Sequence, residues 1–462
     1  MKNGFLYLLN EKLNINGRQI YCKVTGEPNS AHDNQPYVLV ISGGPGFGHE
    51  LTEAYIKRLL SIAEKEKDIL PHFIFFDHLG CGKSDKALDP DKEYTVDNFT
   101  DLAAGLVEVI KDKFNLSHVN LFVEGGSFGS LVAMNFPARK PKWLDPNSDI
   151  ILKQITSKVG PQGSGTADYA FRFLQENYSK HPNYENIVKA QRKLFSGKMQ
   201  SQADYVQNFV LPMASLYVKD VSQSSFNTML KQVITYFPNA IINVLDITNR
   251  LFKMLEIEID SLNFADIMLG KCSIDVLNHF FKVDFNGFNI IETVKQNKYL
   301  YEQIPICLIS ASEDHVVDYR IAETINQQLS HSSAVIIFKE PHMLSKGPSK
   351  NIYDQLNYDL LVSGHVPLAD VIHSVIINHT ISDEFNQLLS VAHHNQSTKI
   401  AIQKSSTAAL LTTMPEQKKE KIIEELADQD HSADPVLIQP ATTSSVNPQE
   451  ITPETLVYKL DF

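Results

Sequence analysis

The stretch Val119–Gly129, which reads VNLFVEGGSFG, decides the fold. An apolar run leads into the pentapeptide Gly125–Gly129 (GGSFG), and a helical apolar pattern follows it. A G-x-S-x-G sequence between a strand and a helix is typical of a sharp turn that holds its serine in a strained conformation, and small residues at 125 and 129 let strand and helix approach. The start of the helix favours negative charge beside Ser127. The sequence therefore predicts a nucleophile at Ser127, the alternative being an incidental serine in a glycine-rich turn.

Short apolar runs of the same kind occur elsewhere and indicate strands that are buried on both faces, as in a parallel sheet. They are Tyr37–Ile41, Phe73–Phe76, Ile304–Ile309 and Ala334–Phe338. Helical patterns separate them, and one apolar helix face is formed by Phe99, Leu102, Ala103, Leu106 and Ile110. Strands that alternate with such helices predict a doubly wound α/β domain.

Three departures from this alternation define the expected organisation. Asn16-Gly17 between two β-prone runs predicts a hairpin near the N-terminus. The breaker cluster Gly160–Gly165 opens a long, mostly helical stretch, so a helical insertion is expected there. Beyond about residue 362 the chain becomes polar, with a short solvated helix predicted at 415–428 and a flexible tail at 431–452.

A serine nucleophile needs an orienting acid and a base, which follow it along the chain in that order in this kind of fold. Asp314 lies just past the strand Ile304–Ile309 and is the preferred acid, with Glu313 as its competitor. His342 follows the next strand and is the predicted base. His315 is the rival histidine, but it adjoins the acid on the same loop.

An oxyanion hole should use one backbone amide just after the nucleophile and one from the loop after an early strand. Phe128 supplies the first, and Gly44 in the loop Ser42–Gly46 (SGGPG) is predicted to supply the second. A phosphate-binding loop is the competing interpretation, but Pro45 removes a donor where a phosphate needs one. The Gly82-Lys83-Ser84 stretch also fails as a P-loop, because Asp77 stands where that motif requires glycine.

Composition excludes several classes of protein. The 462 residues carry a net charge of −12, which argues against nucleic-acid binding, and residues 381–462 contribute half of it with 12 acidic and six basic residues. The four cysteines show no CxxC spacing, so neither a disulfide scaffold nor a zinc site is expected. No apolar run is long enough to span a membrane, and the run Phe5–Leu9 is too short for a secretory signal. A cytoplasmic protein without membrane contact is predicted, and its oligomeric state is left open.

Four blocks of this sequence resemble the proline iminopeptidase family of α/β-hydrolases, over roughly residues 15–160 and 300–360. The family's HGGPG appears as SGGPG, its Asp-x-Arg-Gly-x-Gly-x-Ser segment as DHLGCGKS, and its GGSWG elbow as GGSFG. The acid and histidine blocks correspond to Asp314 and His342. The sequence departs from the family at four motif positions, none of which is a catalytic group. They are Ser42 for His, Leu79 for Arg, Phe128 for Trp, and Pro341 for Gly.

The resemblance implies an α/β-hydrolase fold with a mostly parallel sheet, an inserted helical cap and a polar C-terminal extension. The expected parts are a core at residues 1–162 and 303–362, a cap at 163–302 and the extension at 363–462. Acidic cap residues capture the substrate's α-amine in the family, but no cap motif aligns here. Glu176, Glu185, Asp220 and Asp246 are present there and are expected on solvated helix faces.

The leading hypothesis is a serine hydrolase that releases an N-terminal proline, or another N-terminal residue, through an acyl-enzyme and without metal or cofactor. The alternatives are an esterase or lipase-like enzyme that acts on small acyl substrates, and a catalytically silent effector or binding protein on the same fold. The Glu- and Lys-rich C-terminal segment resembles translocation signals of bacterial effectors, so a secreted protein without a cleavable signal is the alternative location.

Overall fold

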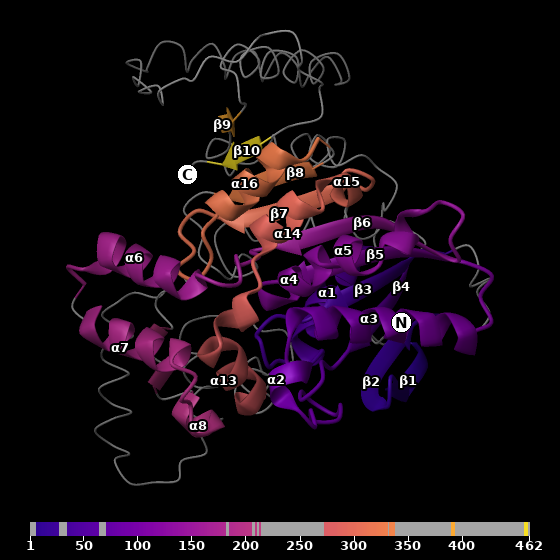
Figure 1. Cartoon of the computed structure of the whole chain (residues 1–462), viewed down its shortest axis with the longest axis horizontal. Coiled ribbons are helices and arrows are strands. Elements are labelled where there is room, and N and C mark those ends of the chain that lie inside the picture. Colours follow the sequence, from indigo (N-terminus) through magenta and orange to yellow (C-terminus); the bar gives the residue numbers. More distant parts are fainter. Residues whose placement is uncertain are drawn as a thin grey trace.

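The computed structural model describes residues 6–26, 35–63, 71–181, 184–205, 208–209, 212–213, 272–330 and 332–337, and two short strands at 390–392 and 457–460. Figure 1 shows a central twisted sheet with helices against it and a helical group at one side. His342 and the segments predicted at 415–428 and 431–452 lie outside the described residues. Among the helices that the structure describes, none is long and apolar enough to cross a membrane.

The N-terminal hairpin is confirmed. β1 (Tyr7–Ile15) and β2 (Arg18–Thr25) pair antiparallel, with Ile15 opposite Arg18. Asn16 and Gly17 both have positive φ, 52° and 81°, as a two-residue hairpin turn of this type requires.

The predicted parallel strands form the centre of the sheet, which has the order β1-β2-β4-β3-β5-β6-β7-β8-β10-β9. In this order, every pair of neighbours between β4 and β10 is parallel. The pairs β1 with β2, β2 with β4, and β10 with β9 are antiparallel. The further strands are β3 (Tyr37–Ile41), β4 (His72–Phe76), β5 (Val119–Gly126), β6 (Ile150–Lys158), β7 (Ile306–Ala311), β8 (Ser332–Ile337), β9 (Ser390–Ala392) and β10 (Val457–Leu460).

The seventh strand begins two residues later than the predicted start at Ile304. The physical reason is Pro305, which has no N–H to donate to a neighbouring strand. Its carbonyl instead accepts a hydrogen bond from Ile155 at 3.1 Å, and the paired strand starts at Ile306.

Helices cover both faces of the sheet because the strand side chains alternate between them. On one face, α1 (Glu50–Ala63) packs on alternate residues of β3 and β4. On the other, the predicted amphipathic helix is α3 (Val96–Lys113), beside α4 (Phe128–Met134) and α16 (Arg320–Gln328). The shorter helices of this part are α2 (Pro90–Glu93), α5 (Phe136–Arg139) and a 3-10 turn at Pro141–Leu144.

Residues 159–305, which we call the insertion, connect the adjacent strands β6 and β7. Gly163 pairs with Asn289, and the Ser164 amide donates to the Phe288 carbonyl at 2.7 Å, so the two ends of the insertion meet. Its described elements are α6 (Thr166–Tyr178), α7 (Tyr184–Phe195), α8 (Gln202–Tyr205), α13 (Ile274–Lys282), a 3-10 turn (Asp284–Gly287), α14 (Ile290–Gln296) and α15 (Lys298–Tyr301).

Candidate active site

Ser127 occupies the sharp turn between β5 and α4. Its backbone has φ 51° and ψ −123°, a conformation that residues with a Cβ rarely adopt and that persists only where the surroundings impose it. Its N–H donates to the Lys158 carbonyl at 2.8 Å, which ties the turn to the end of β6. The residue is half-buried, so the fold presents a strained and accessible serine at a strand tip.

The close approach predicted for the two outer glycines is confirmed. A Cβ added at Gly125 would overlap the carbonyl of Gly129, and one added at Gly129 would overlap the carbonyl of Ile41. At Gly126, by contrast, a Cβ would meet nothing within 4 Å. Two of the three glycines are therefore required by packing.

Ser130, which sequence reasoning did not single out, stabilises this turn from within. Its hydroxyl is buried and donates to the Gly125 carbonyl at 2.7 Å. The Lys158 N–H donates to the Ser130 Oγ at 3.1 Å. Ser130 thus holds strand and helix together behind Ser127.

The glycine-rich loop, residues 42–47, lies beside Ser127. A Cβ added at Gly43 would be 3.1 Å from the Gly126 carbonyl oxygen and 3.4 Å from the Ser127 Cβ. Gly44 has φ 126°, and a Cβ there would be 2.7 Å from the Gly46 nitrogen. The loop backbone that approaches Ser127 is therefore that of Gly43, and Gly44 and Phe128 stay the predicted oxyanion donors.

Asp314 is fully buried after β7 and is held by backbone groups. Its Oδ1 accepts hydrogen bonds from the amides of Val316 and Val317 at 2.8 and 2.9 Å. The Tyr169 hydroxyl of α6 donates to its carbonyl at 2.9 Å.

The two neighbours of Asp314 differ from it in their surroundings. Glu313 is half-buried. Burial of Tyr178 and, to a smaller extent, the charge of Glu313 raise the pKa of Tyr178. His315 is buried. The rigid carboxylate of this loop is therefore that of Asp314, which favours it over Glu313 as the orienting acid.

An aromatic cluster that includes the Phe128 ring lies beside the Ser127 turn. The Phe128 ring packs edge-to-face on Phe280 of the insertion and on Phe99 of α3, with distances of 4.7 and 5.9 Å between ring centres. His78 stacks on Phe99 at 4.9 Å, and burial lowers the pKa of His78 to about 4. His78 is therefore neutral at pH 7, and Leu79, in the place of the family's arginine, is buried in the same core.

A buried ion pair lies at the strand ends that carry the turn. Lys158 on β6 binds Glu124 on β5, and each side chain is about 5% exposed. The ammonium also lies 5.1 Å from the ring centre of Tyr55 on α1. Burial of both charges makes each dependent on the other.

A second polar network fixes the far end of the glycine-rich loop. Asp77 accepts hydrogen bonds from the His49 amide at 2.9 Å and the Lys83 amide at 2.8 Å, and its Oδ1 lies 2.7 Å from His49 Nδ1. Burial opposes the charged forms, but these contacts outweigh it, lowering the pKa of Asp77 and raising that of His49.

Within the described residues, potential metal-ligand atoms of His49, Glu50 and Asp77 lie within 4.8 Å of one another. His49 and Asp77 bind each other, and Lys23 and Lys57 neutralise Glu53 beside them. His49 Nδ1 also lies 3.9 Å from Glu50 Oε2, so the three residues of the cluster lie against one another.

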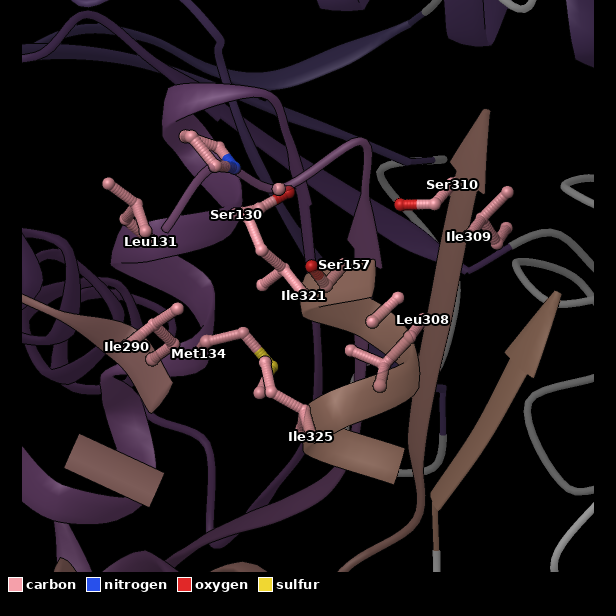
Figure 2. A pocket seen from close by; sticks show the side chains of 13 residues that line it. Ser130, Leu131, Met134, Ser157, Ile290, Leu308, Ile309, Ser310, Ile321 and Ile325 are labelled. Carbon is pink, nitrogen blue, oxygen red and sulfur yellow. The ribbon is translucent and has the colours of Figure 1, made fainter. Parts of the chain in front are cut away.

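Figure 2 shows a small cavity below the turn, between α4, α16 and β7. Its wall is mostly apolar and includes Met134, Leu308 and Ile325, with Ser130 and Ser157 at one side. The centre of a water molecule has about 10 Å³ in which to move, so it fits about one water. It is a packing gap behind the turn and too small for a substrate.

Comparison with known proteins supports the fold. A family model described as the alpha/beta hydrolase fold matches residues 36–145, which contain the glycine-rich loop and the Ser127 turn. The chain has the α/β-hydrolase fold. No curated protein matches its sequence.

Solved structures of low sequence identity align with most of the chain. VinJ is 13% identical with a TM-score of 0.49, covering 78% of this chain and 99% of its own. The enol-lactonase from Burkholderia xenovorans is 14% identical with a TM-score of 0.44 and coverages of 76% and 99%. Proline iminopeptidase from Mycobacterium smegmatis is also 14% identical, with a TM-score of 0.45 and coverages of 76% and 97%.

Proposed function

We propose that this α/β-hydrolase is a serine hydrolase with Ser127 as its nucleophile. The observation that carries the proposal is the strained backbone of Ser127 at an accessible strand tip, between glycines that packing requires. Strain of this kind persists where function selects it, because a relaxed turn costs less to fold.

In the proposed mechanism, His342 takes the proton from Ser127 Oγ as the oxygen attacks the substrate carbonyl. Asp314 orients the imidazole, which its two backbone hydrogen bonds equip it to do. The amides of Phe128 and Gly44 stabilise the tetrahedral oxyanion. The protonated histidine then donates its proton to the leaving group, which departs as its bond to the carbonyl carbon breaks. Water hydrolyses the acyl-enzyme and restores Ser127. No step requires a metal ion or an organic cofactor.

The proposed substrate is a peptide with an N-terminal proline or another N-terminal residue, on the strength of the SGGPG and GGSFG motifs. A small acyl ester is the second candidate. It is favoured by the exposure of Glu176 and Glu185, two of the four cap acids singled out in the sequence, since an exposed carboxylate is poorly placed to capture an amine beside Ser127. The remaining acids considered, Asp220 and Asp246, lie outside the described residues.

A fluorophosphonate probe tests the nucleophile directly, because it reacts with activated serines. Wild type should be labelled and Ser127→Ala should not, while Ser117→Ala, which changes an exposed serine, should react as wild type does. Wild type as unreactive as Ser127→Ala would leave a silent binding protein and overturn the proposal.

A substrate panel then separates the two chemistries. Proline arylamides are compared with short and long acyl esters at matched concentrations. Cleavage of the arylamide supports the peptidase, whereas strong ester turnover without arylamide cleavage removes it in favour of the esterase.

A further inference from the structure

The glycine-rich loop contacts the insertion through its backbone. The Ser273 N–H, just before α13, donates to the Gly46 carbonyl at 2.7 Å. Gly46 has φ 107°, and a Cβ there would lie 2.8 Å from the Ser273 carbonyl oxygen and 3.3 Å from the Cys272 Sγ. Two backbones therefore meet without room for a side chain.

The next loop residue anchors the same contact by its side chain. Phe47 is 7% exposed and packs in an apolar cluster whose other described members all belong to the insertion. Among them are Leu174 of α6, Leu194 of α7 and Leu277 of α13. Phe47 thus belongs to the α/β part of the chain, but its side chain is buried in the insertion.

Helix α13 connects this anchor to the core on its other side. Val276 and Phe280 belong to the main hydrophobic core, whereas Leu277 packs with the insertion. The core therefore determines the position of α13, and α13 in turn determines the position of Gly46 through the Ser273 amide. Gly46 lies only two residues from Gly44. Two residues after Phe47, the bonds between His49 and Asp77 hold the same end of the loop.

We propose that the start of α13 positions the oxyanion-donating loop, with the Ser273 amide as the positioning group and Phe47 as its side-chain anchor. The insertion then contributes to transition-state stabilisation in addition to enclosing the substrate. This inference rests on the proposed serine hydrolase function.

Two substitutions of Ser273 test the backbone contact with Gly46. Its φ of −75° is within the range of proline, so Ser273→Pro removes the N–H donor at a compatible backbone angle. Ser273→Ala keeps that donor, and both variants lose the hydroxyl that caps α13 by accepting from Val276. The proline Cδ takes the place of the hydrogen that points at the Gly46 carbonyl, so the difference between the variants measures the loss of the whole contact with Gly46.

Kinetics and inhibitor binding supply the readout. A misplaced oxyanion donor lowers kcat more than it changes KM, and loss of one donor typically costs about 10²–10³ in rate. We expect Ser273→Pro to lower kcat at least about tenfold relative to Ser273→Ala. The affinity for a trifluoromethyl ketone, whose adduct with the serine carries an oxyanion, should fall by the same factor.

Lys86→Met is the matched control. It removes another contact between core and α13, the exposed pair of Lys86 with Asp275 at 3.4 Å, without touching the loop. We expect kcat and ketone affinity close to those of wild type. Should Ser273→Pro fail to fold, Phe47→Ala is compared with Phe47→Leu, and the truncated variant should show the larger loss of kcat.

The inference is overturned if Ser273→Pro equals Ser273→Ala in kcat and ketone affinity, or if KM alone changes. In the Phe47 comparison, equal kcat values overturn it. Failure of the inference and of the proposed function are distinguishable, because wild type that reacts with fluorophosphonate keeps the function whatever the Ser273 variants do.

Discussion

His78 illustrates how one residue depends on its surroundings. In the sequence it is one of 16 histidines, and it follows Asp77. In the structure it is buried between Phe76, Phe99 and Phe128, and its Nε2 lies 3.4 Å from the Ser42 carbonyl. A neutral ring fills this space at no electrostatic cost, whereas a protonated one would be a buried cation.

This burial predicts a dependence of stability on pH. Native His78 gains its proton near pH 4, whereas a histidine in the unfolded chain gains it near pH 6.5. Between these values the unfolded state binds more protons, so the stabilisation is complete above pH 6.5 and is lost as the pH falls towards 4. The loss should reach about 3 kcal/mol.

Urea unfolding of wild type and His78→Gln across pH 4–7.5 checks this. The variant keeps a donor but cannot titrate, so the stability difference between the two proteins should change over this window. His118→Gln, at a partly exposed histidine before β5, is the control for the substitution itself. A difference that stays constant with pH would contradict the prediction.

At the scale of elements, the ends of β5 and β6 must stay in register for Ser127 to keep its conformation. Gly126 pairs with Lys158, whose carbonyl accepts the Ser127 N–H. The ion pair between Lys158 and Glu124 lies across the same two strands. Backbone and side-chain contacts therefore support one register.

Lys158→Met should destabilise the protein by about 3–5 kcal/mol, because it leaves the Glu124 carboxylate buried without its partner. The double variant Glu124→Gln/Lys158→Met should recover much of this loss, since no uncompensated charge remains. Unfolding free energies from urea titrations complete the double-mutant cycle. Additive effects of the two substitutions would show that the pair is not coupled.

At the scale of the whole molecule, core and insertion share one aromatic cluster. Phe280 of α13 contacts Phe128, the residue after Ser127, and Phe99 of α3. Phe195 of α7 instead makes its described ring contacts with Phe171 and Phe281, within the insertion. The two phenylalanines should therefore differ in their effect on the core.

Trp143, the single tryptophan of the chain, is buried in the core and reports its unfolding by fluorescence. Phe280→Ala should lower the unfolding free energy seen by Trp143 by about 3–5 kcal/mol, as expected for a buried phenylalanine. Phe195→Ala should have a much smaller effect on the same signal. Equal effects would mean that α13 is no more strongly coupled to the core than α7.

Local sequence predicted the hairpin at Asn16-Gly17, the buried strands and the serine turn, because each depends on backbone preferences and apolar runs that lie close together in the chain. It also singled out Asp314, whose place after a strand follows from the alternation of elements. It missed Ser130, Lys158 and Phe47. Their roles come from contacts with residues far away in the sequence, which no local pattern records.

The sequence by itself determined that a serine stands at a strand–helix turn of a parallel sheet, since glycine spacing and periodicity are properties of short segments. Only the tertiary structure decided what holds that serine and the loop beside it. The ion pair between β5 and β6 and the bond from Ser273 to Gly46 join residues that are 34 and 227 positions apart. Such contacts arise from the packing of whole elements, because packing brings distant backbones within hydrogen-bonding distance and excludes the water that would otherwise replace them.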